Sequence, residues 1–475
     1  MTGSITQSAK MESKIPNWII WVQCTAFVVL YAFWILPEIV GFRNTALVVG
    51  ALFGAYSIYQ YRDSFLQKAA IPIWLIIALF IWATLHLFFL SSNFSLQYIE
   101  YFRIWKYAAL GGIMATGLGI SLFHSGPKRF LYVIYFGLCT PLIIYLVKYM
   151  LTSYGVLLGV ELPISLLIYD PSVAIDVANR FYIPKTDYVA FCLPAMAMAL
   201  GFLIQLSQIQ KGWNLKDFFS LLVQILVIGG TLFLFSIQNI KNGMAYAAML
   251  FIIFGIFFFS SHFRSLSWKK IAGIILAFLI LISAIAFNVK KNDSWRTLIA
   301  DTKIGIQLEK YSHWKDTIKY GYPQNEYGTT VSITNYERAA WATAGIKLSI
   351  DDPIGYGLIE DSFAKMAKEH WPDVGATLSH SHSGWLDLIL AIGYPGFLLI
   401  FSALLIVLKH ARLIIQPWAI LAFWPLLANL LLWCTTEVSA TVTFATLIFW
   451  ICLGAGLSLT QTKSSHLQTP AAPTL

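Results

Sequence analysis

Two histidines occupy a polar stretch directly before a long apolar run. The stretch reads Ser379-His380-Ser381-His382-Ser383-Gly384, and the apolar run begins at Trp385. A neutral imidazole can accept a proton from an attacking hydroxyl group, so His382 is a candidate general base. In the first turn of a helix it would be kept neutral by the positive end of the helix dipole. His380 and Ser383 are its candidate supporting residues.

Other interpretations of these histidines stay open. A histidine at a membrane interface is often only an amphipathic boundary residue, and His380 can equally be an ordinary loop residue. Two histidines spaced like His380 and His382 also suggest a metal, but the sequence offers no obvious third ligand. We therefore expect no metal and no other cofactor.

Arginine and lysine residues precede further apolar runs. Arg180 and Lys185 precede one run, Lys241 precedes another, and Arg338 lies on a helix expected in a long polar segment. Helix N-termini present unpaired amides and a positive dipole end, so these cations predict a phosphate or pyrophosphate site. The alternative is that the lysines extend to the membrane interface and that Arg338 pairs with Glu337 or Asp351.

The rest of the chain is strongly apolar. Hydrophobic residues make up 58% of the 475 residues, charged residues make up 12%, and mean hydropathy is +0.69. A soluble domain carries about 25% charged residues, so we predict a polytopic membrane protein of the all-α class. Apolar runs long enough to cross a bilayer as helices are expected at 17–36, 44–60, 71–90, 104–123, 130–150, 188–206, 218–236, 244–260, 271–287, 385–408, 418–433 and 442–460.

Lysine and arginine lie mainly on alternate sides of these twelve expected helices. One set of short segments carries Lys10, Lys14, Arg62, Lys68, Lys128, Arg129, Lys211, Lys216, Arg264, Lys269, Lys270, Lys409, Arg412 and Lys463. The opposite short segments carry little beyond Arg43 and Lys241. Cytoplasmic loops are rich in Lys and Arg, so both termini are expected in the cytoplasm. This bias accounts for most of the net charge of +9 and requires no nucleic-acid partner.

This arrangement divides the chain into four parts. Helices 1 to 9 are expected within 1–287, a large polar segment at 288–384, helices 10 to 12 within 385–460, and a cytoplasmic tail at 461–475. Met1–Lys14 has no apolar core, so a cleaved signal peptide is not expected. The five cysteines lie inside apolar runs without a Cys-x-x-Cys pair, which argues against redox or metal chemistry.

The polar segment is expected to fold. Asn335–Ile350 has helical periodicity and ends before Asp351-Asp352-Pro353. Ile354-Gly355-Tyr356-Gly357 predicts a turn, and Asp361–His370 predicts a second short helix. The chain re-enters the membrane after this segment, with its histidines at that point.

Several of these motifs together resemble the O-antigen ligase and polymerase superfamily. His382-Ser383-Gly384-Trp385-Leu386 followed by Gly393-Tyr394-Pro395-Gly396 is similar to the histidine signature of that family. Arg338-Ala339-Ala340-Trp341 followed by Asp352-Pro353-Ile354-Gly355-Tyr356-Gly357 is similar to its arginine helix and its following turn. Two positions depart from the pattern. Lys241-Asn242-Gly243 stands where the family has Ser-Arg-Gly, and Ser383 follows the histidine where the family has Asn.

The resemblance implies an O-antigen ligase of the bacterial inner membrane. Such an enzyme is a metal-independent inverting glycosyltransferase of lipopolysaccharide biosynthesis. Its donor is a glycan on undecaprenyl pyrophosphate, and its acceptor is a sugar hydroxyl of lipid A–core. His382 would be the base, and Arg338, Lys241, Arg180 and Lys185 would bind the pyrophosphate on the periplasmic side.

Three other functions stay open. An O-antigen polymerase or a protein O-oligosaccharyltransferase of the same superfamily would use the same chemistry on another acceptor. A lipid or solute transporter or flippase is the alternative from a different class. Transporters often carry ionisable residues near the bilayer midplane, and the apolar runs hold few of these, such as Lys148 and Asp387.

Overall fold

The chain folds almost entirely into helices in the part that the structure describes. The computed structural model describes residues 15–34, 36–159, 163, 183–208, 214–262, 296–375, 378–435 and 440–459. Within these ranges no strand forms, and the one β-bridge joins Gln324 to Thr330. The expected all-α class is therefore confirmed for the described residues.

The apolar runs form long helices. They are α1 (Asn17–Phe33), α2 (Val40–Gln60), α3 (Ile71–Phe89), α4 (Phe94–Glu100), α5 (Lys106–Ser125), α6 (Arg129–Leu158), α7 (Lys185–Ser207), α8 (Leu215–Ile237), α9 (Lys241–His262), α16 (Gly384–Ala411), α17 (Trp418–Leu432) and α18 (Ala445–Ser458). The expected helix at 271–287 lies outside the described residues. By length and composition, seven of the described helices could cross a membrane. The protein is thus of the membrane-embedded type, and the count of twelve crossings stays a prediction.

One apolar helix begins well before its expected start at residue 104. Asn93 caps α4 by accepting a hydrogen bond from the Leu96 amide at 3.1 Å, and a π-helical stretch at Tyr101–Trp105 joins α4 to α5. Glu100 at the end of α4 and Arg103 in the π-helical stretch interrupt the apolar pattern, so an apolar-run search does not find this part of the helix.

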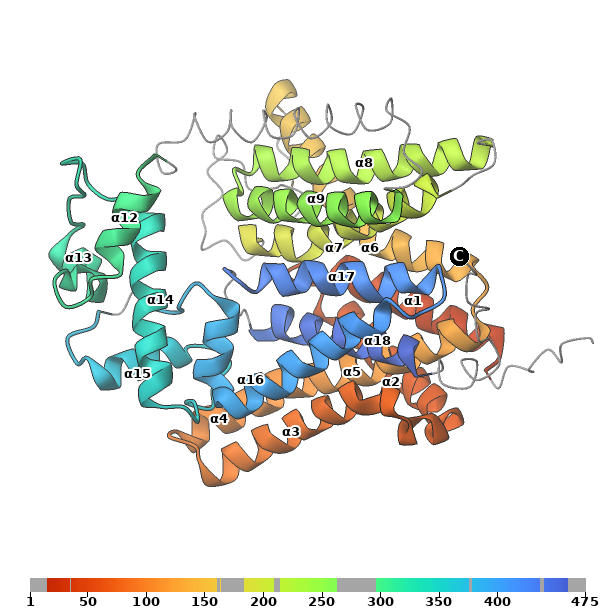
Figure 1. Cartoon of the computed structure of the whole chain (residues 1–475), viewed down its shortest axis with the longest axis horizontal. Helices are drawn as coiled ribbons and strands as arrows, with labels where there is room; N and C mark the ends of the chain where they lie inside the picture. Colours follow the sequence, from red (N-terminus) through yellow and green to blue (C-terminus); the bar gives the residue numbers. More distant parts are fainter. Residues whose placement is uncertain are drawn as a thin grey trace, which may run out of the picture.

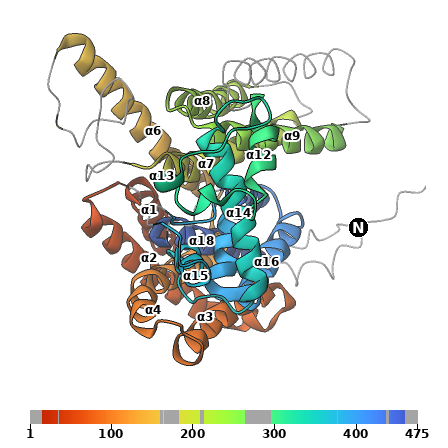
Figure 2. The same cartoon turned by 90° about the vertical axis from the view of Figure 1, so that its left-hand side faces the viewer.

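The polar segment forms a small helical unit at one end of the long helices. It contains α12 (Leu298–Gly305), α13 (Thr317–Tyr320), α14 (Ile333–Asp351) and α15 (Ser362–His370). The two helices expected in this segment correspond to α14 and α15. Figure 1 shows α14 crossing the ends of the long helices, and Figure 2 shows the same end of the molecule face on.

The predicted turn of the polar segment fits into a break in α16. Within α16 the backbone of Gly393 has φ +67°, and Pro395 has no amide hydrogen for the Ala391 carbonyl. The turn supplies the missing donor, since the Gly357 amide donates to that carbonyl at 2.7 Å. The Tyr356 amide likewise donates to the Leu390 carbonyl at 2.8 Å. The broken helix therefore completes its hydrogen bonds with the polar segment.

Two glycines allow this close approach. Gly355 has φ +84° and Gly393 has φ +67°, which is the left-handed region that glycine tolerates best. A Cβ on either residue would collide with the backbone of the other segment. No larger residue fits at either position without moving one segment.

Helices α3 and α4 hold the other side of the same turn. The imidazole of His86 lies 3.0 Å from the Gly355 carbonyl oxygen and accepts a hydrogen bond from Gln97 at 3.1 Å. The buried carboxylate of Glu100 accepts hydrogen bonds from the backbone amides of Ile359 and Glu360. The polar segment is therefore fixed to the long helices by buried hydrogen bonds.

Candidate active site

His382 lies just before α16. The sequence had predicted that it would lie within the first turn of this helix. The helix begins at Gly384 with Ser383 as its N-cap, and His382 has φ +62°. Asp387, in the first turn of α16, accepts a hydrogen bond from the Ser381 amide at 2.8 Å, which holds the chain before the helix against its first turn. The prediction that His382 lies within the first turn, at the positive end of the helix dipole, is therefore wrong.

The imidazole of His382 is held by neighbouring rings. It stacks on the indole of Trp341, with ring centres 5.0 Å apart and planes within 6°. The ring of His380 stands nearly perpendicular to that of His382, with centres 4.5 Å apart. Trp341 itself is fixed, because its Nε1 donates to the Trp314 carbonyl at 3.2 Å. Helix α14 thus sets the orientation of the candidate base.

Glu337, on the same helix, lies beside His380. It precedes Trp341 by four residues and so shares its helix face. Its carboxylate accepts a hydrogen bond from the Tyr322 hydroxyl at 2.7 Å and interacts electrostatically with His380. Burial raises the pKa of the Glu337 carboxyl, although Tyr322 and His380 act in the opposite direction. His380 also contacts Ser379, whose hydroxyl lies 2.6 Å from the Nδ1 of His380.

Arg338 reaches the start of α9 and pairs with neither of the carboxylates proposed from the sequence. Its Nη1 donates to the Oδ1 of Asn242 at 2.7 Å. Glu337 instead accepts from Tyr322, and Asp351 lies 3.9 Å from the Nδ1 of His370. The ion-pair alternative for Arg338 is therefore wrong in this structure.

Three of the four predicted cations gather around this contact. Lys241 is the first residue of α9, and both Arg338 and Lys185 are close enough to repel its charge. Arg180, the fourth, lies outside the described residues. A cavity of about 320 Å³ opens beside the group. Its lining consists of Lys241, Asn242, Ala245, Leu298, Thr302, Thr334, Asn335, Arg338 and Ala339.

Such a cavity suits an anion. A guanidinium offers paired donors to phosphate oxygens, an ammonium adds a point charge, and the α9 N-terminus adds unpaired amides. Like charges gathered without a carboxylate among the lining residues repel one another, so a bound anion would relieve that repulsion. In the described ranges no three His, Cys, Asp or Glu side chains gather as metal ligands would.

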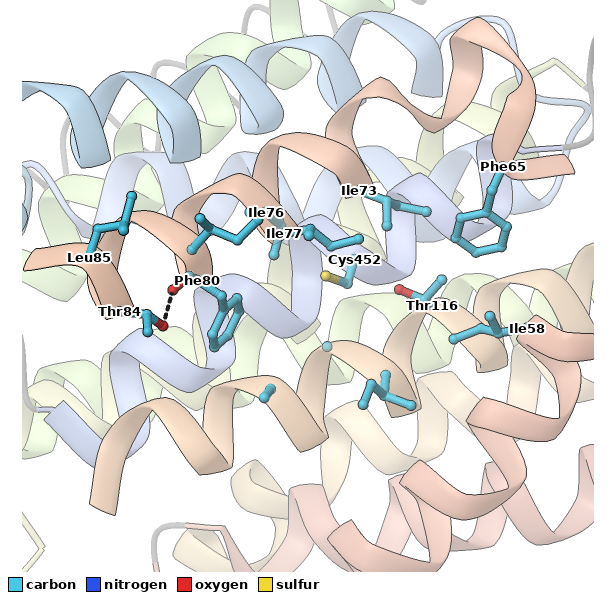
Figure 3. Close-up of a pocket in the computed structure, with 14 residues that line it drawn as sticks. Ile58, Phe65, Ile73, Ile76, Ile77, Phe80, Thr84, Leu85, Thr116 and Cys452 are labelled. Atoms are coloured by element: carbon cyan, nitrogen blue, oxygen red, sulfur yellow. Dashed lines mark hydrogen bonds between the residues drawn. The ribbon is translucent and has the colours of Figure 1, made fainter. Parts of the chain in front are cut away.

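An apolar groove lies elsewhere among the long helices. It has a volume of about 500 Å³ and runs between α2, α3, α5 and α18, as Figure 3 shows. Isoleucine and phenylalanine side chains form most of its walls, with Thr84, Thr116 and Cys452 as its few polar members. It shares no helix with the cationic cavity, whose walls come from α9, α12 and α14.

No protein-family model matches this chain, and no curated protein matches it. The resemblance to the O-antigen ligase superfamily therefore rests on the sequence motifs.

Sequence reasoning missed the partners of the predicted residues. Glu337 could have been found, since it lies one helical turn from Trp341 on α14. Asn242 and Tyr322 could not, because each meets its partner only through the packing of distant segments. Ser383, a predicted supporting residue, is placed as the N-cap of α16 and donates its amide to the Ser381 hydroxyl at 3.3 Å.

Proposed function

We propose that this protein is an O-antigen ligase, which moves a glycan from undecaprenyl pyrophosphate to a sugar hydroxyl of lipid A–core. The observation that supports this most strongly is the double role of α14. Its Arg338 meets Asn242 beside Lys241, and its Trp341 stacks on His382. One rigid helix therefore connects an anion cavity to a candidate base, as transfer from a pyrophosphate donor requires.

The reaction would be a single displacement. The acceptor hydroxyl attacks the anomeric carbon, the bond from that carbon to the phosphate oxygen breaks, and the electron pair stays on the pyrophosphate. His382 takes the hydroxyl proton, and Arg338, Lys241 and Lys185 stabilise the charge of the leaving group. Electrostatic stabilisation of developing charge is often the largest catalytic term, and three cations can supply it here.

Two cavities could receive different parts of the lipid substrates. The cationic cavity fits the pyrophosphate of the donor, and the apolar groove of Figure 3 offers space for a hydrocarbon chain. The site would face the periplasm of a bacterial inner membrane, with both termini in the cytoplasm.

Deletion of the gene tests this function against its nearest alternatives. A ligase predicts lipopolysaccharide without O-antigen, together with accumulation of lipid-linked polymer. A core that carries a single repeat would instead indicate a polymerase of the same superfamily. Normal lipopolysaccharide with unglycosylated surface proteins would indicate a protein O-oligosaccharyltransferase. Lipid-linked glycan retained on the cytoplasmic side would indicate a flippase.

A further inference from the structure

The carboxylate of Glu337 has no part in the proposed displacement, yet it lies next to the histidines. It is half-buried on α14, one turn before Trp341, and it accepts a hydrogen bond from Tyr322 at 2.7 Å. A half-buried carboxylate costs free energy unless its charge is used or compensated. Its neighbour Arg338 is directed to Asn242, to whose Oδ1 it donates a hydrogen bond at 2.7 Å.

We propose that Glu337 is a positioning residue that acts on His382 through His380. The Ser379 hydroxyl lies 2.6 Å from the Nδ1 of His380. Trp341, one helical turn after Glu337 on α14, has its ring centre 6.3 Å from that of His380, and Glu337 is close enough to His380 for their charges to interact. The His380 ring in turn stands 4.5 Å from that of His382 at nearly a right angle. Trp341 closes the other face of His382. The proposal rests on the proposed function, because it assigns Glu337 a role in proton transfer at the same site.

The charge of Glu337 would matter when the base takes its proton. In the displacement, the hydroxyl proton moves to His382 and creates an imidazolium stacked on Trp341. A carboxylate nearby stabilises that positive charge, as an acidic residue does for a histidine base in other enzymes. The proton goes no further than His382 in this step, and Glu337 stays ionised.

The pH dependence follows from the sign of these charges. The base must be neutral and Glu337 must be ionised, so both protonations reduce the rate as the pH falls. Burial raises the pKa of Glu337, which brings its protonation toward the pH range of an assay. The groups that face it are the Tyr322 and Tyr336 phenols and the His380 imidazole.

The test compares purified full-length Glu337→Gln with wild-type protein in transfer from lipid-linked donor to acceptor. We expect kcat to fall about tenfold or more while KM for the donor changes little, because the cationic cavity is untouched. The acid limb of the pH profile should become shallower, from about two protons to about one, since one titrating group has been removed. Glu337→Asp should restore part of the rate, and Tyr322→Phe should lower it by a smaller factor.

Glu369→Gln is the matched control. Glu369 also accepts a hydrogen bond from a tyrosine of the polar segment, Tyr356, at 2.8 Å, but no contact joins it to the histidines. Equal rates and equal steepness of the acid limb in Glu337→Gln and Glu369→Gln would overturn the proposal.

A second measurement separates this proposal from the proposed function. Diethyl pyrocarbonate labels imidazoles, and mass spectrometry reads His380 and His382 individually without any assay of activity. Glu337→Gln should change the labelling rate at His380 severalfold, and Glu369→Gln should not. Such a change in a protein that transfers no glycan would refute the ligase function and leave the positioning role in place. Unchanged labelling would overturn the positioning role itself.

Discussion

Arg338 and Lys241 contribute different groups to one cavity. The guanidinium of Arg338 is a planar fork already held by Asn242, whereas the ammonium of Lys241 is a point charge at the start of α9. The two residues should therefore respond differently to exchange of one cation for the other.

Substitutions at these two cations test the anion cavity. Arg338→Ala should abolish transfer, and Arg338→Lys should restore only part of it, because the fork is lost. Lys241→Arg should be tolerated or should raise activity, since the superfamily that the motifs resemble has arginine at that position. The control is Lys347→Ala. Lys347 lies on α14, as Arg338 does, but it pairs with Glu309 at 3.0 Å outside the cavity. Full transfer by both Arg338→Ala and Lys241→Ala would show that these cations only anchor helix ends.

Substitution of the histidines tests the base. We expect His382→Ala to lower the transfer rate by roughly 10²-fold or more, which is the usual contribution of a general base. His380→Ala should cost less, because His380 acts through His382. His370→Ala, at an exposed histidine of the same segment near Asp351, should leave the rate unchanged. An inactive His380→Ala beside an active His382→Ala would reverse the assignment of the base.

At the scale of elements, the sequence predicts well wherever local pattern decides. The apolar runs within the described residues became helices, Asn335–Ile350 became most of α14, and Ile354–Gly357 became the predicted turn. The break in α16 was not predicted, although Gly393 and Pro395 belong to a motif recognised in the sequence. The carbonyl groups that the break leaves free accept hydrogen bonds from the amides of Tyr356 and Gly357, which belong to another segment.

The same limit applies to the site. His382 and Arg338 were predicted from residue type and from the order of the motifs. The place of His382 outside the first turn of α16 was missed, because it depends on the bond from the Ser381 amide to Asp387. Residue spacing alone does not show at which residue a helix begins.

The contact between the turn and α16 gives a prediction about stability. Gly393→Ala should destabilise the protein by ~1–2 kcal/mol for the left-handed backbone, and by a further ~1–3 kcal/mol for the collision with Ile354. Gly328→Ala is the control, because Gly328 also has positive φ but no atom within 4 Å of an added Cβ. Thermal unfolding in detergent should give a clearly lower Tm for Gly393→Ala than for Gly328→Ala. Equal Tm values would mean that the turn and the broken helix separate easily.

The helices α12 to α15 of the polar segment lie at one end of the long helices, as Figure 1 shows. The distribution of Lys and Arg predicts that this end faces the periplasm. A cysteine at Ser312, which is exposed in the polar unit, should react with an impermeant thiol reagent added to the periplasmic side. A cysteine at Lys128, between α5 and α6, should react only after the inner membrane is opened. Both belong in a Cys434→Ser background, because Cys434 is the exposed cysteine of the described residues.

Reversal of these two labelling patterns would contradict the orientation. The cavity and the histidines would then face the cytoplasm, and lipid-linked polymer on the periplasmic side could not reach them.

The central claim is that α14 joins an anion cavity to a histidine base in a glycan-transfer site. The most direct measurement gives purified protein a lipid-linked glycan and a lipid A–core acceptor, without ATP and without an ion gradient. The account predicts glycan on the acceptor and release of the lipid pyrophosphate in equal amounts, with both lost in Arg338→Ala and His382→Ala. Absence of transfer by correctly folded wild-type protein would contradict it. So would transfer by His382→Ala at the rate of the wild-type protein.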